Sequence, residues 1–141
     1  LEESEGKPSC LAALKEKFIA ANGFIIASPE YNSSFSPLMK NTIDWLSRPD
    51  DNDKGQLKAF KGKTAALLAA SPGSLGGIRG LAQIHSLLSA IGVHVINPQL
   101  SVPFAHKVLS ENDKKIQDES AQKRLESIIG ELVRFTKKVS Q

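Results

Sequence analysis

Two polar loops carry the residues of this chain that could do chemistry. The first, 28–36, offers a stiff ring, a carboxylate, an aromatic face and an amide: Pro29, Glu30, Tyr31 and Asn32. The second, 71–77, combines three glycines with two hydroxyls, so its backbone N–H groups can approach a ligand without interference from Cβ atoms. This mixture suits a planar heterocycle with a polar edge. It equally suits two capped turns in which Asn, Ser and Gly serve turn geometry alone.

Each loop directly follows an apolar segment. Phe24–Ser28 is a continuous apolar run typical of a strand buried on both faces, and Lys63–Ser71 is predicted as a second buried strand. The carboxyl ends of parallel strands meet at one edge of a sheet, where ligands bind in open α/β folds. If the two strands are neighbours, both loops border one crevice.

Helices alternate with these strands along the chain. They are predicted over Ser9–Ala21, from Pro37 to about Leu46, from Gly77 to about Ile91, and over about 113–138. Ser36 is a plausible N-cap, and Met39, Ile43 and Leu46 form a stripe that faces either the core or a partner. Val93–Ile96 reads as a short third strand, whereas 101–112 is ambiguous. The alternation predicts a layered α/β fold with a parallel sheet.

Three strands make a poor sheet of this kind. A wholly apolar strand at Phe24–Ser28 would expose unpaired backbone if it lay at a sheet edge, and the chain opens with a helix where such folds open with a strand. We therefore expect one or two strands to precede Leu1.

A resemblance to a known family is carried by Ser28-Pro29-Glu30-Tyr31-Asn32 and by the run from Leu38 through Asp44-Trp45 to Pro49. These segments strongly resemble the NADPH-dependent FMN reductase family, which includes quinone, azo-dye and chromate reductases. The resemblance extends over about residues 8–135. It implies a flavodoxin-like, three-layer α/β/α fold with a parallel sheet, here without its first two strands.

The resemblance also implies roles for the two loops. Tyr31 and Asn32, with the backbone of Pro29 and Glu30, would hold the flavin ring. Four residues of the second loop would face the pyrimidine side of the ring or leave room for it: Ser71, Gly73, Gly76 and Gly77. The redox chemistry belongs to the cofactor, so no side chain is expected to be catalytic. The glycine pair also opens a helix with Arg79 in its first turn, which leaves a phosphate-binding role open.

The implied activity is an NAD(P)H-dependent flavin reductase that passes hydride from NADPH through FMN to a small acceptor such as a quinone. Members are usually homodimers or homotetramers, and we expect a cytoplasmic protein. Family members begin with a strand and a phosphate-cradling loop that residues 1–141 do not include, so 1–141 is expected to be one domain, the carboxyl-terminal two thirds of a reductase. The alternative is a flavodoxin-like binding or assembly module without turnover.

Composition excludes several other classes. The 141 residues are 40% hydrophobic and 23% charged, which is a globular balance. Basic residues are interleaved with acidic ones and few aromatics accompany them, which disfavours nucleic-acid binding. The longest apolar runs are too short to span a membrane. Cys10, the single cysteine, excludes an internal disulfide and is expected to fill a small apolar site. The spacing of His85, His94 and His106 suggests no metal site.

Overall fold

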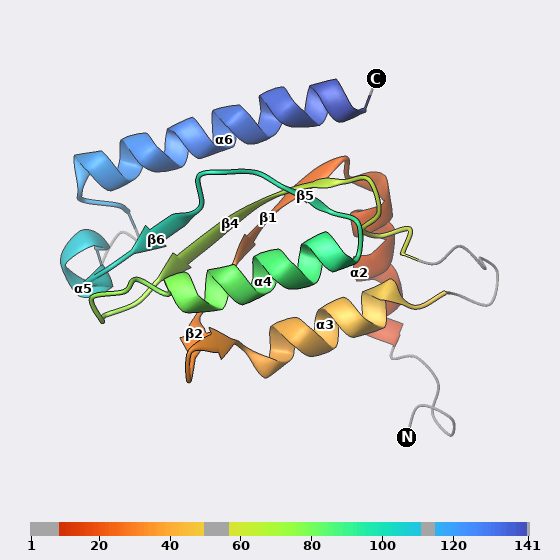
Figure 1. Ribbon diagram of the computed structural model, residues 1–141, viewed down its shortest axis with the longest axis horizontal. Coiled ribbons are helices and arrows are strands. Elements are labelled where there is room, and N and C mark those ends of the chain that lie inside the picture. Colours follow the sequence, from red (N-terminus) through yellow and green to blue (C-terminus); the bar gives the residue numbers. More distant parts are fainter. Residues whose placement is uncertain (1–8, 50–56, 111–114, 141) are drawn as a thin grey trace.

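Four parallel strands form the sheet that carries both polar loops (Figure 1). The computed structural model describes residues 9–49, 57–110 and 115–140. The central strand is β4 (Thr64–Ala70), and β1 (Gly23–Ala27) pairs with it in register from Gly23 opposite Thr64 to Ala27 opposite Leu68. These two strands are therefore neighbours, as the crevice hypothesis requires.

The other side of β4 is covered by two short strands. β5 (His94–Val95) pairs with the first residues of β4, and β6 (Leu100–Val102) pairs with its last three. The cis peptide bond Asn97–Pro98 lies between them. β5 and β6 thus pair one after the other along the same side of β4.

Helices cover both faces of the sheet. α6 (Glu119–Val139) lies on one face, and α2 (Ser9–Ala20), α3 (Pro37–Ser47) and α4 (Ile78–Ala90) lie on the other (Figure 1). A short hairpin of β2 (Glu30–Tyr31) and β3 (Ser34–Phe35) precedes α3, and the single turn α5 (Ala105–Val108) follows β6. The three-layer α/β/α architecture is the predicted one.

The core has two parts because successive side chains of β4 point to opposite faces. Ala65, Leu67 and Ala69 face the layer of α2, α3 and α4, while Ala66 faces α6. On the helices, the predicted stripes are the buried ones: Ile43 and Leu46 on α3, with Met39 packed against them, and Leu81, Ile84 and Leu88 on α4. Ser36 caps α3, since its Oγ accepts from the N–H of Met39 at 3.2 Å, and Pro37 is the first helical residue.

Several expectations were wrong in detail. The strand predicted over Phe24–Ser28 is not buried on both faces: β1 lies at the edge of the described sheet, where Ile25 is 45% exposed. The sequence pattern missed β6, because three residues give too little periodicity to identify a strand. Cys10 is exposed on α2 rather than filling an apolar site.

Two further boundaries differ from the prediction. The segment 29–35 was read as a loop, but it folds into the β2–β3 hairpin. The final helix begins at Glu119, where Asp118 Oδ1 accepts from the N–H of Ala121 at 2.6 Å, rather than near 113. Residues 113 and 114 lie outside the described part of the chain. Among the helices that the structure describes, none combines the length and the apolar character needed to cross a membrane.

Candidate functional site

The two polar loops leave the same edge of the sheet, as predicted. The first loop begins where β1 ends, and the N–H of Ser28 donates to the carbonyl oxygen of Leu68 on β4 at 3.1 Å. The second loop begins where β4 ends, and the N–H of Ser71 donates to the carbonyl oxygen of Val102 on β6 at 3.0 Å. Three strand ends thus meet at the candidate site.

The first loop presents its aromatic and amide groups to solvent. Asn32 and Ser33 form the two-residue hairpin turn with φ values of 50° and 67°, and turns of this kind require positive φ at both central residues. The side chain of Tyr31, just before the turn, is 58% exposed, and Asn32 is exposed as well. The hairpin therefore holds the two predicted ring contacts where a ligand can reach them.

The hairpin is docked on the side of α4. Ser34 Oγ donates to Gln83 Oε1 at 2.6 Å, and Gln83 Nε2 donates to the carbonyl oxygen of Ser33 at 2.7 Å. Gly80 permits this close approach, because a Cβ at that position would lie 3.3 Å from the carbonyl oxygen of Ser34. The position of Tyr31 is thus set by contacts to a helix about fifty residues away in the sequence.

Glu30 makes the strongest of these contacts. Its Oε2 accepts from the backbone N–H groups of Arg79 at 3.0 Å and Gly80 at 3.1 Å, and its Oε1 accepts from Nε and Nη2 of Arg79 at 2.8 and 2.5 Å. The side chain is only 7% exposed. The hydrogen bond from the Arg79 side chain, with those from the backbone, holds the pKa of Glu30 below its ordinary value against the opposing effect of desolvation.

This arrangement corrects one expectation. The helix start after Gly77 was open to a phosphate-binding role with Arg79, but the carboxylate of Glu30 already occupies the N–H groups of the first turn. Gly77, the N-cap of α4, has φ of 88° and provides no side-chain cap, so Glu30 supplies the negative charge that a helix N-terminus favours. The missing N-cap side chain was the signal in the sequence that another residue had to serve this end.

Two of the three glycines of the second loop, Gly76 and Gly77, are required by the packing of the chain itself. Gly76 and Gly77 both have positive φ, of 60° and 88°. A Cβ on Gly76 would lie 2.7 Å from the backbone nitrogen of Pro103, and one on Gly77 would lie 2.6 Å from the Cβ of Ala69. The space that both glycines leave is filled by protein atoms, so a ring that uses this loop meets its backbone.

Ser71 and Gly73 form a turn attached to the segment after β6. The N–H of Gly73 donates to Ser71 Oγ at 3.2 Å, and the carbonyl oxygen of Gly73 accepts from the N–H of Phe104 at 3.2 Å. The carbonyl oxygen of Ser71 accepts from the N–H of Ala105 at 3.0 Å. Phe104 is exposed with φ of 49°, and no sequence pattern identifies it because it falls in the ambiguous segment 101–112.

Two cavities meet at Tyr31. One, of about 480 Å³, is mostly apolar and lies between α2, β1 and α3, with Pro29 and Tyr31 at its end. The other, of about 650 Å³, is an open hollow over the hairpin and is lined by Glu30, Tyr31, Asn32, Ser34, Phe35 and Pro37. The candidate first-loop residues therefore border space that a planar ligand could enter.

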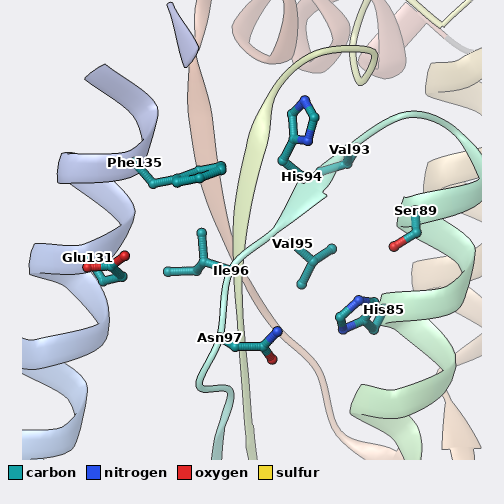
Figure 2. A pocket seen from close by; sticks show the side chains of 9 residues that line it. All are labelled: His85, Ser89, Val93, His94, Val95, Ile96, Asn97, Glu131 and Phe135. Atoms are coloured by element: carbon teal, nitrogen blue, oxygen red, sulfur yellow. The ribbon is translucent and has the colours of Figure 1, made fainter. Parts of the chain in front are cut away.

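A separate cavity contains none of the predicted site residues. This hollow of about 490 Å³ lies between α4, β5 and α6. His85 and Ser89 lie on its α4 side, and Glu131 and Phe135 lie on its α6 side (Figure 2). His85 Nδ1 is hydrogen-bonded to Gln99 Nε2 at 2.7 Å, and the ring of His94 packs edge-on against Phe135. In the described ranges, no group of His, Cys, Asp and Glu side chains is placed to hold a metal ion.

Several known proteins are similar to this chain in sequence. The sequence profile described as NADPH-dependent FMN reductase matches residues 1–107. An NAD(P)H-dependent FMN reductase of Pseudomonas aeruginosa is 32% identical over 116 residues, covering 82% of this chain and 60% of that protein. A quinone reductase of Escherichia coli is 34% identical over 97 residues, covering 69% of this chain and 48% of that protein.

A solved structure extends the likeness to the fold. The flavoenzyme NAD(P)H:(acceptor) oxidoreductase FerB of Paracoccus denitrificans superposes with a TM-score of 0.82 at 27% identity, over 97% of this chain and 72% of that one. The chain spans about half to three fifths of the length of the two curated relatives described above. Because the family profile covers well over half of the chain, the chain belongs to the NADPH-dependent FMN reductase family.

Proposed function

We propose that this chain is part of an NAD(P)H-dependent flavin reductase that passes electrons through bound FMN to a small acceptor such as a quinone. The observation that carries the proposal is the pair of loops at the carboxyl edge of two adjacent parallel strands, with Tyr31 and Asn32 exposed beside two cavities. The printed names of the relatives, FMN reductase and quinone reductase, support the same activity.

In this proposal the first loop binds the flavin ring through Tyr31, Asn32 and the backbone of Pro29 and Glu30. The second loop contributes the hydroxyl of Ser71 and the backbone of its glycines: Gly73, Gly76 and Gly77. The donor set fits a planar ring with a polar edge. The N-terminus of α4 does not add donors for a phosphate, because its N–H groups already donate to Glu30. The phosphate of FMN therefore requires other donors.

When bound, FMN supplies the chemistry by accepting hydride from NADPH and reducing the acceptor. The residues of this chain bind and orient the ring and provide hydrogen bonds to its edge. None of the described candidate side chains is assigned a proton transfer. The fixed hairpin is the relevant contribution, since a ring positioned by rigid elements is held for productive contact with a second substrate.

We further propose a homodimer or homotetramer in the cytoplasm, where both nicotinamide and flavin cofactors are at hand. Leu38 on α3 supports the assembly, because its apolar side chain is 75% exposed beside Tyr31 and Pro29. Ile25 and Tyr31 are also exposed and line the same cavity, and a contiguous exposed apolar surface is typical of one that a partner covers.

The test is an FMN titration followed by flavin fluorescence, on protein whose intact mass has been checked. Saturable quenching at micromolar FMN, followed by NADPH oxidation above the rate of a protein-free blank, would support the reductase. A folded chain that binds FMN without turnover would favour the alternative of a binding or assembly module. A folded chain that leaves FMN fluorescence unchanged would remove the proposed function for this chain.

A further inference from the structure

We propose that Glu30 is a positioning residue that fixes the two candidate flavin loops relative to each other. The inference rests on the proposed function and deepens it, because it identifies the side chain that keeps the ring-binding groups in place. Glu30 acts through the hairpin and α4 and need not touch the flavin with its carboxylate.

The Glu30 carboxylate links the first loop to the start of α4, the helix that follows the second loop. Glu30 directly precedes Tyr31 in the hairpin, and Arg79 and Gly80 lie in the first turn of α4, which directly follows the second loop. Four N–H groups of Arg79 and Gly80 donate to its two oxygens. A displacement of the hairpin from α4 therefore breaks all four hydrogen bonds together.

The physical reason for the strength of this contact is the state of the helix end. α4 has a glycine N-cap without a capping side chain, so the N–H groups of its first turn need an acceptor from elsewhere. A carboxylate is the best acceptor at this end because the helix dipole favours negative charge there. The nearly complete burial of the Glu30 side chain is compensated by those donors.

The other hydrogen bonds described between the hairpin and α4 involve neutral groups and are weaker. Gln83 bonds with Ser33 and Ser34 through neutral, exposed groups. Hydrogen bonds of neutral groups contribute less than those of a carboxylate with charged and backbone donors. The contact of Glu30 with α4 therefore determines the position of Tyr31 relative to the second loop.

The chain offers a matched control. Glu131 on α6 accepts from Nε and Nη2 of Arg134 at 2.9 and 2.5 Å, the same two-pronged geometry that Glu30 makes with Arg79. Glu131 and Arg134 lie three residues apart on one helix and connect no loops. Glu131→Ala thus removes the same two side-chain hydrogen bonds to an arginine, at a side chain that is 33% exposed, without releasing the candidate site.

The experiment compares Glu30→Ala and Glu131→Ala in the full chain by FMN titration and by amide hydrogen exchange. We expect FMN to bind about tenfold more weakly to Glu30→Ala, because bonds to a charged group are lost, and with unchanged affinity to Glu131→Ala. Exchange should increase within 29–36 and 71–80 alone. Added acetate should reverse both effects in Glu30→Ala, since a small carboxylate can occupy the vacated helix end. Glu30→Gln keeps the shape and tests the charge if the alanine variant does not fold.

The outcomes separate this inference from the proposed function. Unchanged FMN affinity in Glu30→Ala and Glu30→Gln would overturn the positioning role, as would an increase of exchange that is uniform over the chain. If the unmodified chain does not bind FMN, the proposed function fails and exchange alone decides. In that case an acetate-reversible increase confined to the two loops supports the role of Glu30, and unchanged exchange contradicts it.

Discussion

The α-carbon of Gly76 faces the backbone of Pro103 so closely that a Cβ there would lie 2.7 Å from the Pro103 nitrogen. This contact packs the second loop directly against the exit of β6. Together with the hydrogen bond from the N–H of Phe104 to the carbonyl oxygen of Gly73, it makes the loops after β4 and β6 one unit. The backbone of the second loop is therefore held from one side by β6 and from the other by α4.

We predict that Gly76→Ala destabilises the protein by about 2–4 kcal/mol. About 1 kcal/mol comes from placing a non-glycine residue at positive φ, and the remainder from the clash with backbone atoms that cannot move aside. The measurement is the urea midpoint of unfolding. Gly62→Ala is the matched control, because Gly62 also has positive φ but its Cβ would meet nothing within 4 Å. A Gly62 variant as unstable as the Gly76 variant would contradict the packing argument.

The contact of Glu30 with Arg79 predicts a specific dependence of stability on pH. Because the folded state lowers the pKa of Glu30, the ionised carboxylate stabilises the protein above the ordinary glutamate pKa of about 4.3. That stabilisation is lost as pH falls through the lowered value. Wild type should therefore exceed Glu30→Gln in stability at about pH 7, and the difference should shrink at about pH 3.

Urea unfolding of both proteins at the two pH values measures this difference. Glu131 also has a lowered pKa through its pair with Arg134, but it is present in both proteins and its effect cancels in the comparison. A stability difference that stays constant with pH would show that the negative charge of Glu30 does not stabilise its contact with α4. A variant more stable than wild type at neutral pH would show that desolvation outweighs the hydrogen bonds.

Much of the fold could be predicted because local signals agreed with one another. The Ser36–Pro37 pair marks a helix start, and the stripe of Ile43 and Leu46 identifies its buried face. The apolar run of β4 predicted the strand that the second candidate loop follows. These features depend on residues within one turn or one strand, so local sequence patterns are enough to predict them.

The parts that could not be predicted depend on contacts between distant segments. Glu30 looks like a loop carboxylate until α4 is placed beside it, since its donors lie 49 and 50 residues further on. The exposure of Ile25 follows from the place of β1 at the edge of the described sheet rather than from its composition. β6 forms only because β4 offers it a partner.

The N-cap of α3 gives a prediction about the element that follows the first loop. Ser36→Ala should destabilise the protein by about 1 kcal/mol, because the N–H of Met39 loses its acceptor at the buried start of the helix. Ser36→Thr retains a hydroxyl and should cost less than half of this. Thermal unfolding of the three proteins measures the effect. Equal losses in both variants would indicate that packing at this buried position matters more than capping.

Tyr31 gives the most direct test of the candidate ring contact. Its side chain is 58% exposed, so Tyr31→Leu should change stability by less than about 0.5 kcal/mol. If the ring stacks or packs on a bound flavin, the same change should weaken FMN binding by about two- to twelvefold, corresponding to the roughly 0.5–1.5 kcal/mol typical of aromatic pairs. Tyr31→Phe keeps the ring and should bind FMN nearly as wild type does, unless the phenol hydroxyl also donates to the flavin.

Flavin fluorescence titrations of the three proteins separate these contributions. Ile129→Ala on α6 serves as the control, because Ile129 is also an exposed apolar side chain but lines neither of the two cavities at Tyr31. A loss of affinity in Tyr31→Leu that Tyr31→Phe restores would identify the ring face as the contact. Equal FMN affinity in all four proteins would show that the flavin does not contact Tyr31. The ring would then have to bind to the second loop alone.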